Sequence, residues 1–159
     1  VRSFTKTYGI PAIITRACNS YGPFQNPGKF LPRCIVNALE NNPIPVCGDG
    51  SDVREWIHVL DHCTAIIRTM FFGKPGEIYN IGSGEEISDL ALAKKVVKYM
   101  GKREDLIRIT GDMPTRNLRC ALNSFKIRNH TRWNNKYSLE EGLMETIKWY
   151  ENNRDWWQS

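Results

Sequence analysis

Short apolar segments rich in β-branched residues alternate along this chain with longer segments of helical periodicity. Five segments have the length and composition of strands: residues 12–15, 43–47, 56–59, 77–82 and 107–109. Four segments repeat apolar side chains every three or four positions, as amphipathic helices do: residues 29–39, 61–73, 88–101 and 138–152. This alternation predicts an α/β fold with parallel strand pairing.

The first residues resemble the end of an element rather than the start of a domain. Val1 opens a stretch typical of the last turns of an amphipathic helix, which Gly9 closes and Pro11 terminates. Residues 12–15 then predict a buried strand, and the polar residues 19–28 predict a loop. Because the chain opens with neither methionine nor a signal segment, we expect it to be part of a longer polypeptide.

Several helix starts are marked by capping residues. Asp61 is the expected N-cap of the second helix, and Ser88 that of the third. Ser138 and Glu141 have the spacing of a capping box, which predicts a helix that reaches about Asn152. The aromatic residues near the C-terminus then fit the packing of a terminal helix better than the stacking of RNA bases: Trp149, Tyr150, Trp156 and Trp157.

Composition places the chain among ordinary globular domains. It has 159 residues, of which 41% are hydrophobic and 25% charged, and its formal net charge is +5. No apolar run has the roughly 18 residues that a membrane helix needs, so a membrane partner is not expected. The cations are scattered, which gives a nucleic-acid partner little support and suits an anionic small molecule equally well.

Cysteine usage indicates a reducing compartment. The five cysteines are odd in number, far apart and set in apolar segments: Cys18, Cys34, Cys47, Cys63 and Cys120. Without a C-x-x-C pair, neither a disulfide framework nor a zinc site is predicted. We therefore expect buried free thiols and a cytoplasmic protein.

Three kinds of catalytic or cofactor motif are incomplete or absent in the sequence. Residues 48–50 and 82–84 are G-x-G pairs without the third glycine of a dinucleotide-binding loop, so turns explain them better. His58 and His62 are four residues apart, but a strand-to-helix break between them disfavours a metal site. No serine sits in a G-x-S-x-G elbow. The residues alone therefore assign no catalytic, metal-binding or NAD-binding group.

A set of polar residues at strand ends and in loops remains. Asn19, Lys29, Arg54 and Asn80 can together clamp a diphosphate, because arginine offers a planar fork of donors and lysine a point charge. Equally, the two asparagines can satisfy backbone groups while the cations are surface residues. The basic loop 112–119 can reach the same ligand or be simply solvated.

Four motifs, in this order, resemble the dTDP-glucose 4,6-dehydratases among the extended short-chain dehydrogenase/reductases. They are Arg16-Ala17-Cys18-Asn19-Ser20-Tyr21-Gly22-Pro23, Pro27-Gly28-Lys29-Phe30-Leu31-Pro32, Gly48-Asp49-Gly50 with Arg54-Glu55-Trp56-Ile57-His58-Val59-Leu60-Asp61-His62, and Tyr79-Asn80-Ile81-Gly82. The closing Trp-Tyr-x-x-Asn-x-x-Trp-Trp favours the same family. The resemblance covers essentially the whole chain.

The resemblance implies an α/β, Rossmann-type fold of which this chain is the C-terminal, substrate-binding part. Residues 1–20 would complete the Rossmann domain, whose NAD-binding part would precede Val1. In the family, NAD oxidises the sugar at C4, water leaves across C5 and C6, and the hydride returns to C6. The NAD loop, the Tyr-x-x-x-Lys pair and the acid/base carboxylates would be absent here, so the chain alone is expected to be inactive. The whole protein is expected to be a homodimer.

The same resemblance assigns substrate contacts residue by residue. The matched substrate-binding positions are Asn19, Lys29, Phe30, Pro45, Arg54 and Asn80, with Arg116 as an additional cation. Two positions depart from the family pattern. Cys47 replaces an aromatic residue beside the thymine, and Met113 replaces an arginine of the diphosphate clamp.

We therefore expect the nucleotide-sugar-binding part of an NAD-dependent lyase that converts dTDP-glucose to dTDP-4-keto-6-deoxyglucose. A UDP-sugar epimerase or decarboxylase of the same superfamily is one alternative. A non-catalytic module that binds nucleotide sugars is the other.

Overall fold

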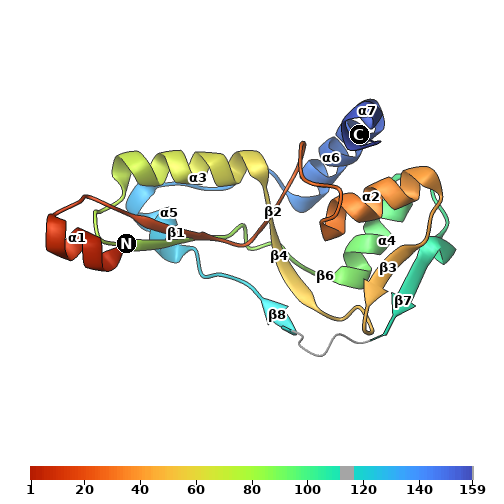
Figure 1. Ribbon diagram of the computed structural model, residues 1–159, viewed down its shortest axis with the longest axis horizontal. Coiled ribbons are helices and arrows are strands. Elements are labelled where there is room, and N and C mark those ends of the chain that lie inside the picture. Colours follow the sequence, from red (N-terminus) through yellow and green to blue (C-terminus); the bar gives the residue numbers. More distant parts are fainter. Residues whose placement is uncertain (112–116, 159) are drawn as a thin grey trace.

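Three small sheets organise the part of the chain that the computed structural model describes, residues 1–111 and 117–158. Its strands are β1 (Ile14–Ala17), β2 (Asn19–Tyr21), β3 (Ile44–Cys47), β4 (Val53–His58), β5 (Ile78–Ile81), β6 (Glu86–Ser88), β7 (Ile107–Thr110) and β8 (Arg119–Cys120). Strands β1 and β5 pair in parallel at one end of the elongated molecule, and β3 and β7 pair in parallel at the other (Figure 1). Between them, β4 pairs with β2 and β8 in parallel and with β6 in antiparallel orientation.

The helices divide between the same two ends. They are α1 (Arg2–Tyr8), α2 (Phe30–Glu40), α3 (Val59–Phe72), α4 (Asp89–Tyr99), α5 (Phe125–Thr131), α6 (Leu139–Asn152) and α7 (Arg154–Gln158), with a 3₁₀ turn η1 (Glu104–Leu106). Helices α3 and α5 contact each other and β5, whereas α2, α4 and α6 pack together at the opposite end (Figure 1). Strand β4 therefore connects two groups of helices.

Two hydrophobic cores correspond to these two groups. The larger core lies among α2, α4 and α6, and Trp56 of β4 belongs to it. The smaller core lies under α3 and α5, and Ile57 of the same strand belongs to it. Successive side chains of a strand point to opposite faces, so one strand can serve both cores. This alternation places β4 at the centre of the molecule.

The predicted alternation of strands and helices is confirmed, with three local corrections. The strand predicted at residues 12–15 begins later, at Ile14, and it is mostly exposed rather than buried, because its sheet has only two strands in the described part. The first residues of the predicted loop 19–28 form β2. Asp61 does not cap a helix: α3 begins two residues earlier, and the Asp61 carboxylate accepts the N–H groups of Lys136 and Tyr137.

The other predicted helix starts are confirmed. Ser88 caps α4 by accepting the N–H of Ala91, and Ser138 forms the predicted capping box with Glu141 at the start of α6. His58 ends β4 while His62 lies in α3, so the two histidines do not share a helix. Trp149, Tyr150 and Trp157 pack in or against the larger core, as their spacing predicts, whereas Trp156 is exposed.

The cysteines are free, but only some are buried. Cys34 is buried and Cys18 and Cys47 are half-buried, whereas Cys63 and Cys120 are exposed, which corrects the prediction of uniformly buried thiols. Cys63 lies in α3 and Cys120 in β8. Among the helices of the described ranges, none is long and apolar enough to cross a bilayer.

Candidate functional site

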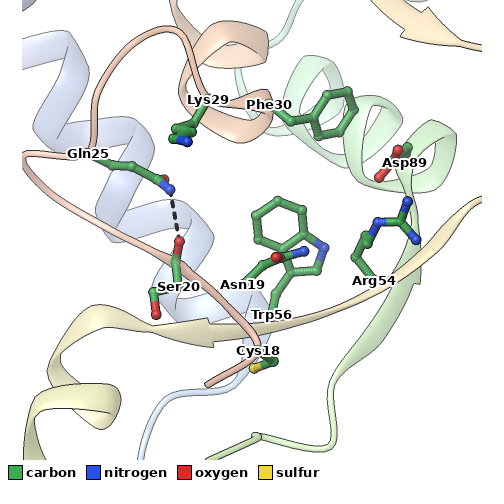
Figure 2. A pocket seen from close by; sticks show the side chains of 9 residues that line it. All are labelled: Cys18, Asn19, Ser20, Gln25, Lys29, Phe30, Arg54, Trp56 and Asp89. Carbon is green, nitrogen blue, oxygen red and sulfur yellow. Dashed lines mark hydrogen bonds between the residues drawn. The ribbon is translucent and has the colours of Figure 1, made fainter. Parts of the chain in front are cut away.

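A cavity of about 410 Å³ opens between β2, β4 and the starts of α2 and α4 (Figure 2). Polar and aromatic side chains from these elements line it: Cys18, Asn19, Ser20, Gln25, Lys29, Phe30, Arg54, Trp56 and Asp89. Segments that are far apart in the sequence therefore meet at one place. We describe this cavity as the candidate site.

Strand pairing brings the floor of the cavity together. In the parallel pair β2–β4, Asn19 lies opposite Trp56. Arg54 is two residues before Trp56, so the two side chains point to the same face of β4. The register thus places an amide, an indole and a guanidinium side by side, as Figure 2 shows.

The N-terminus of α2 faces the cavity without a capping side chain. Lys29 occupies the N-cap position, and within the described part of the chain no side-chain cap hydrogen bond is made to the first turn. The N-terminus of α4 differs, because the Ser88 hydroxyl accepts the N–H of Ala91 at 3.3 Å and Asp89 adds a negative charge in the first turn. An anion in the cavity would therefore be favoured mainly by the dipole and free N–H groups of α2.

Two cations lie at this cavity in different surroundings. The Arg54 guanidinium lies 3.3 Å from the Asp52 carboxylate and also donates to the carbonyl oxygen of Asn117, which fixes its orientation. Within the described ranges, no carboxylate lies within salt-bridge distance of the Lys29 ammonium. Arg54 is thus a pre-oriented fork of donors, and Lys29 is an exposed point charge.

The thiol at the cavity is a poor nucleophile. Burial, together with the charge of the nearby Glu55 carboxylate, raises the pKa of Cys18 to about 12. The thiol therefore stays protonated at neutral pH. The lining residues can therefore bind an anion that also carries hydroxyl groups and an aromatic ring.

The buried carboxylate of Glu55 lies near Cys18 and binds two backbone segments beside the cavity. Glu55 of β4 is 1% exposed and accepts the N–H groups of Gly84 and Leu122, each at 2.7 Å. Gly82 approaches it so closely that a Cβ there would lie 2.4 Å from a Glu55 oxygen. These contacts join the segment after β5 and the segment before α5 to the central strand.

Four of the predicted substrate-binding residues line the cavity together: Asn19, Lys29, Phe30 and Arg54. Two others do not line it. Pro45 lies in β3 opposite Arg108 of β7, and Asn80 lies half-buried in β5 opposite Arg16 of β1. Arg116 and Met113 lie outside the described residues.

Five further lining residues were not predicted from the sequence: Cys18, Ser20, Gln25, Trp56 and Asp89. Trp56 follows Arg54 at a spacing of two within a strand, a signal that the two share a face. Asp89 directly follows a helix cap, which hides it among ordinary capping residues. Gln25 lies in the loop between β2 and α2, where the sequence carries no periodicity.

Residues 1–82 match the profile of the NAD dependent epimerase/dehydratase family. The chain is 38% identical to a dTDP-glucose 4,6-dehydratase of Streptomyces niveus over 96% of this chain and 46% of that protein. Its structure is similar to that of a Bacillus anthracis dTDP-glucose 4,6-dehydratase in complex with NAD, with a TM-score of 0.93 and 41% identity over 99% of this chain and 50% of that chain.

A second solved structure is similar to the same extent. DesIV, a dTDP-glucose 4,6-dehydratase of Streptomyces venezuelae with NAD and TYD bound, gives a TM-score of 0.96 at 38% identity, covering 99% of this chain and 49% of that chain. The chain spans about half the length of the curated relatives it matches.

Proposed function

The chain belongs to the NAD dependent epimerase/dehydratase family, and on that premise we propose that it is the nucleotide-sugar-binding half of a dTDP-glucose 4,6-dehydratase. The similar proteins of Streptomyces and Bacillus anthracis carry that name. The proposal assigns a lyase activity to the whole protein and substrate binding to this chain.

One observation supports the proposal above the others. A single cavity collects Asn19, Lys29 and Arg54 at the uncapped N-terminus of α2. A diphosphate matches this arrangement, because it can accept from the arginine fork, the lysine ammonium and free backbone N–H groups together.

Each residue has a distinct part in this binding scheme. Arg54 is held by Asp52, so little side-chain freedom is lost when it binds a diphosphate. Lys29 adds charge, and the Asn19 amide supplies both a donor and an acceptor. Phe30 and Trp56 flank the same space with apolar rings. Three positions remain proposed contacts on the basis of the family resemblance: Pro45, Asn80 and Arg116.

We propose NAD as the cofactor of the whole protein, held outside this chain. The residues in hand do not fit a dinucleotide: residues 48–50 form a turn between β3 and β4, and residues 82–84 lead from β5 to β6 rather than into a helix. We assign no catalytic group to this chain. The chain's own contribution is therefore to bind and orient the nucleotide sugar.

Replacement of Arg54 in the whole protein tests the substrate site. We expect Arg54→Ala to raise the KM for dTDP-glucose about tenfold to hundredfold, because a charge-assisted contact to the diphosphate is lost. The matched control is Arg103→Ala, because Arg103 is also paired with an aspartate two residues away but lies far from the cavity. Steady-state kinetics and the NAD content of the purified protein are measured together.

An unchanged KM for Arg54→Ala would remove Arg54 from the site. Product analysis separates the enzymes of the family, since a dehydratase releases a 4-keto-6-deoxy sugar whereas an epimerase or decarboxylase does not. A whole protein that binds dTDP-glucose tightly without turnover would instead support the non-catalytic binding module.

The proposal includes a homodimeric, cytoplasmic whole protein that binds neither nucleic acid nor membranes. Exposed apolar residues on α1, Phe4 and Tyr8, support a subunit interface there. The five free cysteines support a reducing compartment. Light scattering of the whole protein tests the dimer. Nucleic-acid binding that weakens steeply with salt would contradict the partner assignment.

We also propose that residues 1–20 complete a Rossmann domain. The parallel pairing of β1 with β5 supports this and extends the same unit to residues 78–81. A structure of the whole protein in which β1 does not extend a larger parallel sheet would contradict it.

A further inference from the structure

The loop between β2 and α2, residues 22–29, has an inner side at the cavity and an outer side at the C-terminal helices. On the inner side, Gln25 and Lys29 line the cavity (Figure 2). The Gln25 side-chain amide donates to the carbonyl oxygen of Ser20 at 2.9 Å, and the Lys29 N–H donates to the carbonyl oxygen of Asn26 at 3.0 Å. The first bond attaches the loop to β2, and the second lies within the loop.

The outer side of the loop is attached by aromatic residues of α6 and α7. The Phe24 ring lies 4.6 Å from Trp149 and 5.9 Å from Trp156, measured between ring centroids. The Tyr150 hydroxyl donates to the carbonyl oxygen of Gln25. Tyr150 itself has no exposed surface, and its own carbonyl oxygen accepts the indole N–H of Trp157 at 2.9 Å. A continuous path of contacts thus runs from the larger core to the cavity loop.

The backbone at Phe24 shows that these contacts hold the loop in a particular conformation. Phe24 has a φ of +63°, in the left-handed region that is costly for a residue with a bulky side chain. Such a conformation persists only where surrounding contacts favour it. Phe24 is immediately followed by Gln25, so a change at Phe24 would redirect the chain that carries Gln25 and Lys29.

We propose that Tyr150, Trp149 and Trp156 are positioning residues for nucleotide-sugar binding, which hold residues 22–29 so that Gln25 and Lys29 face the cavity. The inference rests on the proposed function of the cavity. A loop that is already ordered loses less conformational freedom when a ligand binds, so the C-terminal helices increase affinity without touching the ligand.

The sharpest variant is Tyr150→Phe in the whole protein, because it removes one hydroxyl and keeps the buried ring. We expect the Kd for dTDP, measured by titration calorimetry, and the KM for dTDP-glucose to rise by about fivefold to tenfold. The kcat and the NAD content should stay within about twofold, since the loop carries no catalytic group. The matched control is Tyr99→Phe, which removes a tyrosine hydroxyl from α4, away from the loop.

Two further measurements separate positioning from general stabilisation. Trp156→Ala should weaken dTDP binding, and Trp156→Phe should restore most of the affinity because a ring again contacts Phe24. In a double-mutant cycle, Tyr150→Phe should cost less affinity when Lys29 is already alanine, since its effect acts through the loop that carries Lys29.

The outcomes distinguish the two proposals. A lower Tm for Tyr150→Phe with unchanged Kd and KM would overturn the positioning role and leave the proposed function intact. Full additivity with Lys29→Ala would also overturn it. A wild-type protein that binds neither dTDP nor dTDP-glucose would overturn the proposed function, and the positioning role with it.

Discussion

Helices α2, α4 and α6 lie at one end of the molecule and α3 extends toward the other (Figure 1). Most apolar side chains of α2, α4 and α6 are buried or half-buried, whereas many of those on α3 are exposed. Ile35 of α2 and Val96 of α4 have no exposed surface. On α3, Ile67 is 51% exposed and Met70 is 65% exposed. Both ends consist of amphipathic helices on parallel strands, so the difference lies in what covers each helix.

The apolar faces of α2, α4 and α6 cover one another, whereas α3 presents exposed apolar side chains in the described part of the chain. The cavity, with Lys29 and Arg54, lies at the end formed by α2, α4 and α6 and at the central strand β4. The opposite end presents a set of exposed apolar residues on one helix: Leu60, Ile66, Ile67, Met70, Phe71 and Phe72. Contiguous apolar surfaces of this kind mark interaction sites. The cavity and the exposed apolar residues of α3 therefore lie at different parts of the described structure.

The largest expected effect contrasts two isoleucines on helices. Ile35→Ala should lower the free energy of unfolding of this chain by about 2–5 kcal/mol, because it opens a cavity in the larger core. Ile67→Ala should change it by less than about 0.5 kcal/mol, because half of that side chain already contacts water. Urea denaturation measures both. Equal losses would show that α3 is as well covered as α2.

The connection between the two ends can be tested at Gly82. An alanine Cβ there would lie 2.4 Å from a Glu55 carboxylate oxygen and 2.8 Å from the Ser124 hydroxyl. We expect Gly82→Ala to cost about 1–3 kcal/mol of unfolding free energy, since the buried contacts must shift. Gly111→Ala is the control, because no described atom beyond its own and adjacent residues lies within 4 Å of its added Cβ. A neutral Gly82→Ala would mean that the joint at Glu55 is loose.

A pH-dependent effect is expected at His58, where β4 passes into α3. His58 is 2% exposed, and burial lowers its pKa, although the charges of Glu145 and Asp61 act in the opposite direction. His58 is thus harder to protonate in the folded protein than in the unfolded chain. Stability should be fully present above the unfolded pKa of about 6.5 and fall as the pH drops below it.

Urea denaturation between pH 8 and pH 5 measures this dependence. The pKa of His62 is also lowered by burial, so part of the loss belongs to that residue. His58→Phe should therefore flatten the profile without abolishing its slope. A profile identical to that of the wild type would exclude His58 as a contributor.

The order and type of most elements could be predicted from the sequence, because periodicity and caps are local. The Ser138 capping box and the Ser88 cap depend on residues a few positions apart. The exposure of β1 could not be predicted, since apolar composition says which residues avoid water and not which neighbours cover them. The error at Asp61 has a similar cause: its partners, the N–H groups of Lys136 and Tyr137, are about 75 positions away.

Only part of the candidate site could be predicted, because the site depends on strand register as well as on local patterns. Asn19 and Arg54 stood out as polar residues at strand ends, and the β2–β4 register brings them together. Trp56 looks like an ordinary core residue until that register is known. Gln25 lines the cavity directly after Phe24, whose positive φ no local pattern near it predicts.

The smallest expected effect concerns recognition of the nucleotide base at β3, which packs against α2 and α4. Cys47 lies on β3 two residues after Pro45, so the two half-buried side chains share a face. The family resemblance implies an aromatic residue at the position of Cys47. Cys47→Tyr in the whole protein should therefore tighten binding of dTDP by a factor of about 2–10, the gain typical of one stacked ring. Titration calorimetry with dTDP measures it, and Cys63→Tyr on the exposed α3 is the control. Tighter binding in both variants would mean that the gain is not specific to the β3 face. The assignment of ligand binding to the end that carries β3 would then be wrong.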